Sequence, residues 1–180
     1  MKLVLPFCIL TLLGLGCANT SNTPVMNLSQ VRPGIWRSGQ PTTSEQWQYL
    51  YNLGIRHVVK LNFIGEGSDS EATRIGMTVH TLSIQPEGDL NIWDNITNSF
   101  MEPDGQLIEE AEKVIEGNTG VLVHCTYGRD RTGVVVGISR LRVEHWSKTR
   151  ALEEMLKQGF SPALVGLDSF WTKYNMKGSK

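Results

Sequence analysis

The stretch Val121-Leu-Val-His-Cys-Thr-Tyr-Gly-Arg-Asp-Arg-Thr-Gly133 determines the fold that we expect for this chain. Its apolar start, Val121 to Val123, follows the turn residues Asn118-Thr119-Gly120, which predicts a short buried strand. From Thr132 onward the residues are apolar on most faces, which predicts a buried helix. The sequence therefore predicts a strand, a tight loop and a helix in immediate succession.

The loop between strand and helix has the residues of an anion site with a nucleophile at its base. Cys125 is separated from Arg131 by five residues. A loop of this length can turn its backbone N–H groups toward one point, and the next helix directs its positive end there. The Arg131 guanidinium matches two oxygens of a phosphate, and a cysteine in such a positive field ionises readily. The residues that we expect to bind substrate are Thr126, Tyr127, Gly128, Arg129, Asp130 and Arg131.

The same stretch resembles the signature loop of the cysteine-dependent protein tyrosine phosphatases. The pattern His-Cys-x-x-Gly-x-x-Arg-Thr/Ser-Gly is met at His124, Cys125, Gly128, Arg131, Thr132 and Gly133. The segments Trp36–Pro41 and Leu53–Leu61 resemble the opening of small bacterial phosphatases related to the plant and fungal atypical dual-specificity phosphatases. The resemblance implies a phosphatase without a cofactor, in which Cys125 is the nucleophile and Arg131 binds the phosphate.

We expect one α/β domain over residues 25–180, with a central, mostly parallel sheet flanked by helices and the phosphate-binding loop between a strand and a helix. Alternating or continuous apolar segments predict strands at 28–31, 34–37, 55–61 and 78–84. The pattern Thr42-x-x-Glu45 is a capping box that predicts a helix start, and Gly54 predicts its end. Helical periodicity also predicts helices near 70–75, 103–117 and 149–158.

Hydrolysis of a phosphomonoester also requires a general acid that protonates the leaving group. The family resemblance implies an Asp roughly thirty residues before the cysteine. Asp94 stands 31 residues before Cys125 and is favoured, whereas Asp89 lies closer to the end of the preceding strand. Asp130 inside the loop is a third candidate. Two supporting roles are expected: His124 helps to keep the thiol ionised, and the Thr132 hydroxyl donates to the sulfur.

The N-terminus predicts export. Lys2 precedes a nearly unbroken apolar run from Leu3 to Gly16, which is shorter than the roughly 20 residues of a spanning helix. The run ends at Gly14-Leu15-Gly16-Cys17, which resembles a bacterial lipobox with Cys17 as the lipidated residue. We expect a signal over 1–17, a tether over 18–24, and a periplasmic or outer-membrane lipoprotein. Simple secretion after cleavage at Ala18 is the alternative.

Net charge and residue spacing give no indication of a nucleic-acid-binding protein or a metalloprotein. The net charge is −1, so nothing in the overall balance favours nucleic acid. No group of His, Cys and carboxylates has the spacing of a metal site, and His57 and His80 are expected to lie on strands, packed or at the surface. The expected substrates are phosphorylated proteins, phosphoinositides or inositol phosphates. The alternatives are an inactive phosphate-binding module, a rhodanese-like sulfurtransferase and an arsenate reductase.

Overall fold

The computed structural model describes residues 25–85 and 105–175, which form a five-stranded sheet in the order β1-β2-β5-β3-β4. The strands are β1 (Ser29–Arg32), β2 (Ile35–Ser38), β3 (His57–Lys60), β4 (Thr78–Thr81) and β5 (Val121–His124). β1 runs antiparallel to β2, and every other neighbouring pair is parallel. The expected α/β fold with a mostly parallel sheet is confirmed.

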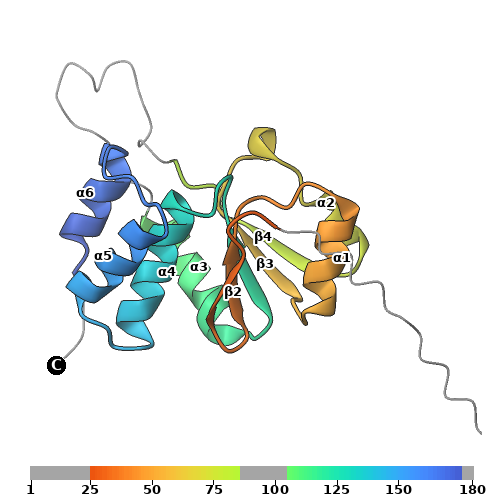
Figure 1. Ribbon diagram of the computed structural model, residues 1–180, viewed down its shortest axis with the longest axis horizontal. Coiled ribbons are helices and arrows are strands. Elements are labelled where there is room, and N and C mark those ends of the chain that lie inside the picture. The colour runs from red at the N-terminus through yellow and green to blue at the C-terminus, as the bar shows by residue number, and fades with distance from the viewer. Residues whose placement is uncertain (1–24, 86–104, 176–180) are drawn as a thin grey trace, which may run out of the picture.

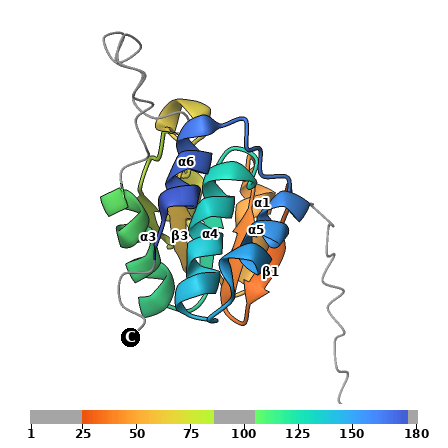
Figure 2. The ribbon, with the colours of Figure 1, turned by 90° about the vertical axis from the view of Figure 1, so that its left-hand side faces the viewer.

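Helices cover both faces of this sheet (Figure 1). They are α1 (Ser44–Asn52), α2 (Ser70–Arg74), α3 (Gly105–Gly117), α4 (Asp130–Arg142), α5 (Lys148–Lys157) and α6 (Val165–Lys173), with a short 3-10 helix η1 (Ile64–Glu66). α1 and α2 lie on one face, and α3 to α6 lie on the other, with α4 central among them (Figure 2). Among the described helices, none combines the length and the apolarity needed to cross a bilayer.

The central strand β5 is buried on both faces because it lies between the two helical layers. Its side chains alternate, so Val121 and Val123 join the core under α3 to α6, whereas Leu122 joins the core under α1 and α2. Both strand neighbours and both layers therefore hold β5 in place. Cys125 follows β5 directly, so its backbone position is fixed by the same packing.

The start of α1 differs by one residue from the predicted capping box. The N-cap is Thr43, whose hydroxyl accepts a bond from the Gln46 backbone N–H. The Gln46 side chain reaches back one residue beyond the N-cap, where its Oε1 accepts the Thr42 backbone N–H at 2.7 Å. The prediction from Thr42 and Glu45 was wrong because Gln46 can serve as the returning side chain just as well as glutamate. The predicted helix end is confirmed, with Gly54 at φ +90°.

Candidate active site

The candidate site lies where the parallel strands end. In the register of the sheet, His124 of β5 stands level with Ser38 of β2 on one side and Lys60 of β3 on the other. Cys125 follows as a buried free thiol, and α4 begins five residues later at Asp130. Ligands of open α/β sheets bind at this carboxyl edge, so the fold places Cys125 where chemistry is expected.

Contacts from β2, from the residues that follow it and from the turn before β1 hold the loop in a specific shape. The Arg37 Nη2 donates to the Gly128 carbonyl at 2.8 Å, and the Gln40 backbone N–H donates to the Thr126 carbonyl at 3.1 Å. The Asn27 Nδ2 donates to the Tyr127 carbonyl at 2.8 Å. Three consecutive carbonyls of the loop are therefore bound from outside it.

These carbonyl contacts determine where the loop N–H groups point. A trans peptide unit directs its N–H opposite to its C=O, and the described residues contain no cis peptide. With the carbonyls of residues 126–128 turned outward, the N–H groups of residues 127–129 face the opposite way. Converging N–H groups of this kind form an anion-binding concavity.

Gly128 has a separate steric requirement. Its φ is +69°, and a Cβ at this position would lie 2.3 Å from the carbonyl carbon of Ser38. No side chain fits there, because the loop passes directly against the end of β2. The glycine of the signature pattern is therefore required by this close approach as well as by its conformation.

Arg131 is buried on the first turn of α4 and is gripped by a carboxylate from another loop. Its Nη1 donates to Glu66 Oε2 at 2.8 Å, and its Nη2 donates to Glu66 Oε1 at 2.6 Å. The Thr126 hydroxyl also donates to Glu66 Oε1, at 2.6 Å. Hydrogen bonds from Arg131 lower the pKa of Glu66 to about 2, so this side chain stays a carboxylate at neutral pH.

Glu66 is a site residue that the sequence analysis missed. It stands in Gly65-Glu66-Gly67, in the loop that follows β3. A glutamate between glycines after a parallel strand was the available signal, because such loops meet at the carboxyl edge of the sheet. Arg131 thus has its planar fork already oriented by two parallel hydrogen bonds.

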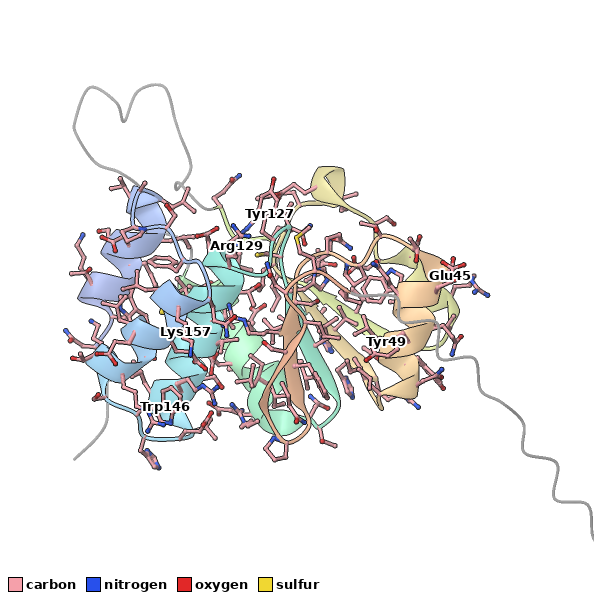
Figure 3. The ribbon with its side chains drawn as sticks, viewed as in Figure 1. Glu45, Tyr49, Tyr127, Arg129, Trp146 and Lys157 are labelled. Carbon is pink, nitrogen blue, oxygen red and sulfur yellow. The ribbon has the colours of Figure 1, made fainter. Side chains whose placement is uncertain are left out.

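The structure assigns different surroundings to the other predicted loop residues. Asp130 Oδ1 accepts the Ser161 backbone N–H at 2.8 Å, which ties the loop to the segment after α5. This contact supports an anchoring role for Asp130. Tyr127 and Arg129 are exposed at the edge of the sheet (Figure 3). Arg129 lies against Gly159, with its Cδ within 3.0 Å of a Cβ built on that glycine.

The surroundings of the two supporting residues differ from each other. His124 is fully buried, and its Nε2 lies 2.8 Å from Asp69 Oδ2. The Thr132 hydroxyl is buried without a hydrogen-bond partner among the described residues, so the predicted bond to sulfur is not formed in this structure. Asp89 and Asp94 lie outside the described residues, as do residues 1–24 with Cys17.

Nothing in the described ranges indicates a metal centre. Residues 25–85 and 105–175 contain no group of three or more His, Cys, Asp or Glu side chains that could hold an ion. His57 and His80 stack across β3 and β4 with ring centroids 5.9 Å apart, on the strands where the sequence analysis placed them.

Comparison with known proteins shows the family of this chain. The sequence over residues 23–178 matches the family model described as the tyrosine phosphatase family. The chain is 34% identical over 137 residues to the inositol diphosphatase DSP2 of Oryza sativa subsp. japonica, covering 73% of this chain and 61% of the relative. It is 32% identical over 138 residues to the dual specificity protein phosphatase TpbA of Pseudomonas aeruginosa, covering 76% of this chain and 56% of the relative.

The fold is also found among solved structures. The crystal structure of the core catalytic domain of the PP-IP phosphatase SIW14 from S. cerevisiae superimposes with a TM-score of 0.66 at 22% identity. The match covers 86% of this chain and 88% of the other. This chain spans about 61% and 56% of the rice and Pseudomonas relatives, so it corresponds to a part of each. With the Cys125 loop intact and most of its length matched, the chain belongs to the tyrosine phosphatase family.

Proposed function

We propose that this chain hydrolyses phosphomonoesters through a cysteinyl-phosphate intermediate. The observation that carries the proposal is the outward anchoring of three consecutive loop carbonyls, at Thr126, Tyr127 and Gly128. This anchoring directs the loop N–H groups to one side, next to the buried Cys125 thiol. Arg131 adds a preoriented guanidinium from the first turn of α4.

The chemistry proceeds in two steps. The Cys125 thiolate attacks phosphorus, an S–P bond forms, and the P–O bond to the alcohol or phenol breaks. A general acid donates a proton to the departing oxygen. Water then attacks phosphorus and gives a proton to the conjugate base of that acid, the S–P bond breaks, and inorganic phosphate leaves with the thiolate and the acid restored. Arg131 and the loop N–H groups bind the phosphoryl oxygens throughout both steps.

Among the substrate classes, we favour a phosphotyrosyl protein. Three exposed apolar side chains stand on the loop or on segments that bind it. Tyr127 on the loop is 56% exposed, Met26 beside Asn27 is 51% exposed, and Ile64 in η1 with Glu66 is 80% exposed. Of the other cations near the loop, Arg37 binds the Gly128 carbonyl and Lys60 binds buried groups, whereas Arg129 on the loop itself is exposed. An apolar rim suits an aromatic ring, whereas an inositol pyrophosphate needs several free cations.

A substrate panel tests the proposal. The names of the relatives point in two directions, toward an inositol diphosphatase and toward a dual specificity protein phosphatase. We expect phosphate release from p-nitrophenyl phosphate, and a higher kcat/KM for phosphotyrosyl peptides than for an inositol pyrophosphate. A reversed preference would contradict the substrate class. Binding of vanadate without any turnover would indicate the inactive phosphate-binding module instead.

The general acid can be identified by how strongly the rate of each variant depends on the leaving group. The Ile84 carbonyl lies 3.5 Å from Arg131 Nη1, so the chain leaves for residues 86–104 from beside the loop. We expect Asp94→Asn to slow alkyl phosphates by about 10²–10⁴-fold and aryl phosphates with acidic phenols far less, because only poor leaving groups need the proton. The alkaline limb of the pH–rate profile should flatten in the same variant.

Two further variants serve as controls for this assignment. Asp89→Asn should give a smaller loss that is uniform across leaving groups, and Asp130→Asn should mainly weaken binding. If Asp94→Asn slows good and poor leaving groups equally, Asp89 becomes the acid.

We also propose that the mature protein is a lipoprotein anchored through Cys17. The support is the basic start at Lys2, the apolar run that follows and the lipobox-like Gly14–Cys17. Metabolic labelling with a palmitate analogue should mark the wild-type protein, and Cys17→Ser should release it from membranes. Soluble, unlabelled wild-type protein would favour cleavage at Ala18.

A further inference from the structure

A buried polar cluster lies behind the phosphate-binding loop, and the two steps written above give its members no bond-making or proton-transfer role. Its members are Gln40, Lys60, Asn62, Asp69 and His124, none more than 8% exposed. The Lys60 ammonium donates to Gln40 Oε1 at 3.0 Å, to Asn62 Oδ1 at 3.4 Å and to Asp69 Oδ1 at 3.2 Å. Gln40 Nε2 donates to the same Asp69 oxygen at 2.8 Å. Buried networks of this kind hold one arrangement firmly when every member is satisfied.

Asp69 links this cluster to the active site. Its Oδ1 accepts from Lys60 and Gln40, and its Oδ2 faces His124 Nε2 at 2.8 Å. Burial acts to raise the pKa of Asp69, but hydrogen bonds from His124 and Gln40 and the Lys60 charge outweigh it and lower the pKa. An ionised carboxylate only accepts hydrogen bonds, so the His124 Nε2 must carry a proton and donate it. The contact therefore fixes the tautomer of the ring.

The ring that Asp69 orients belongs to the residue immediately before Cys125. His124 is fully buried, and Trp47 packs against it edge-on with ring centroids 6.1 Å apart. Its Nδ1 is buried without a hydrogen-bond partner among the described residues. Asp69 is therefore the hydrogen-bond partner that sets which way this ring is turned and which nitrogen holds the proton.

We propose that Asp69 is a positioning residue for the hydrolysis, acting through His124 on the Cys125 nucleophile. This inference rests on the proposed function. Asp69 holds the imidazole with the proton on Nε2, which keeps Nδ1 and the His124–Cys125 peptide in one arrangement. The charged or titratable groups of this cluster and of the adjoining loop are Arg37, Lys60, Glu66, Asp69, His124, Cys125, Tyr127, Arg129, Asp130 and Arg131.

Asp69→Asn should reverse the tautomer while preserving the size of the side chain. Lys60 and Gln40 both present donors to position 69, since the Gln40 Oε1 is already occupied by Lys60 and Asn62. The new amide must turn its oxygen toward them and its NH₂ toward His124. The His124 Nε2 then has to accept, and the ring proton moves to Nδ1.

We expect kcat of Asp69→Asn to fall by roughly 10–100-fold with little change in KM. This is less than the ~10⁴-fold loss seen where the misoriented imidazole itself transfers the proton. The acidic limb of the plot of kcat/KM against pH should shift along the pH axis. The pH dependence of Cys125 inactivation by iodoacetate should shift as well. Asn62→Ala is the matched control, because Asn62 belongs to the same cluster and its side chain bonds to Lys60 and Gln40. It should lower the melting temperature and leave both pH profiles in place.

A ¹⁵N NMR measurement of the His124 ring on the full wild-type chain tests the tautomer independently of any variant. A protonated Nε2 in the wild type and a protonated Nδ1 in Asp69→Asn are expected. An unprotonated Nε2 in the wild type would overturn the inference even if the variant does not fold. If the wild type is active and Asp69→Asn has the same kcat and the same pH profiles, the inference is also overturned. Absence of wild-type turnover would instead refute the proposed function.

Discussion

Cys125→Ser should abolish phosphate release while the loop keeps its affinity for phosphate or vanadate. The thiol is buried at the end of β5, and the residues that bind the anion lie on the loop and α4. A serine hydroxyl at neutral pH is not ionised, so it lacks the nucleophile of the first step, whereas the N–H groups and Arg131 are untouched. Steady-state assays with p-nitrophenyl phosphate and calorimetric titration with vanadate measure the two properties separately.

Cys17→Ser is a matched control for this experiment, because it makes the same chemical change outside the phosphatase domain. Its turnover in detergent solution should equal that of the wild type. Hydrolysis by Cys125→Ser at more than a few per cent of the wild-type rate would rule out the cysteinyl-phosphate mechanism. Loss of vanadate binding in the same variant would mean that the loop depends on the sulfur for its shape.

Arg131→Lys should reduce kcat/KM by roughly 10²-fold or more, because one ammonium cannot replace a planar fork of donors. Arg131 already uses both Nη atoms to bind the two oxygens of Glu66, and its Nη2 also donates to the Thr126 hydroxyl at 2.9 Å. Lysine would lose this orientation in addition to its second contact with phosphate. Steady-state kinetics of both proteins on an aryl phosphate give the ratio.

Arg74→Lys provides the control for this substitution. Arg74 forms a comparable two-pronged pair with Glu71, at 2.6 and 2.8 Å, on the exposed surface of α2. Losing that pair should leave the kinetics unchanged, since an exposed ion pair contributes little. If Arg131→Lys also behaves like the wild type, the loop does not hold phosphate through this guanidinium.

The sequence alone predicted the elements whose information is local. The strand at Val121, the loop after Cys125 and the buried helix after it follow from apolar runs, turn residues and spacing within residues 118–141. The helices α2 and α5 were expected at 70–75 and 149–158, and they occupy Ser70–Arg74 and Lys148–Lys157. Boundaries differ by a residue because several side chains can supply the same cap, as at Thr43 and Gln46.

The tertiary structure decided which distant side chains complete the site. Glu66 lies 65 positions before Arg131, Asp69 lies 55 before His124, and Arg37 lies 91 before Gly128. These residues meet because β2, β3 and β5 are parallel neighbours whose carboxyl ends share one edge. The order β1-β2-β5-β3-β4 follows from how the apolar faces of all the helices pack together, and no local pattern encodes it. The nucleophile and the phosphate-binding arginine could therefore be predicted from one stretch of sequence. The groups that orient them could be identified only from the arrangement of the strands in the tertiary structure.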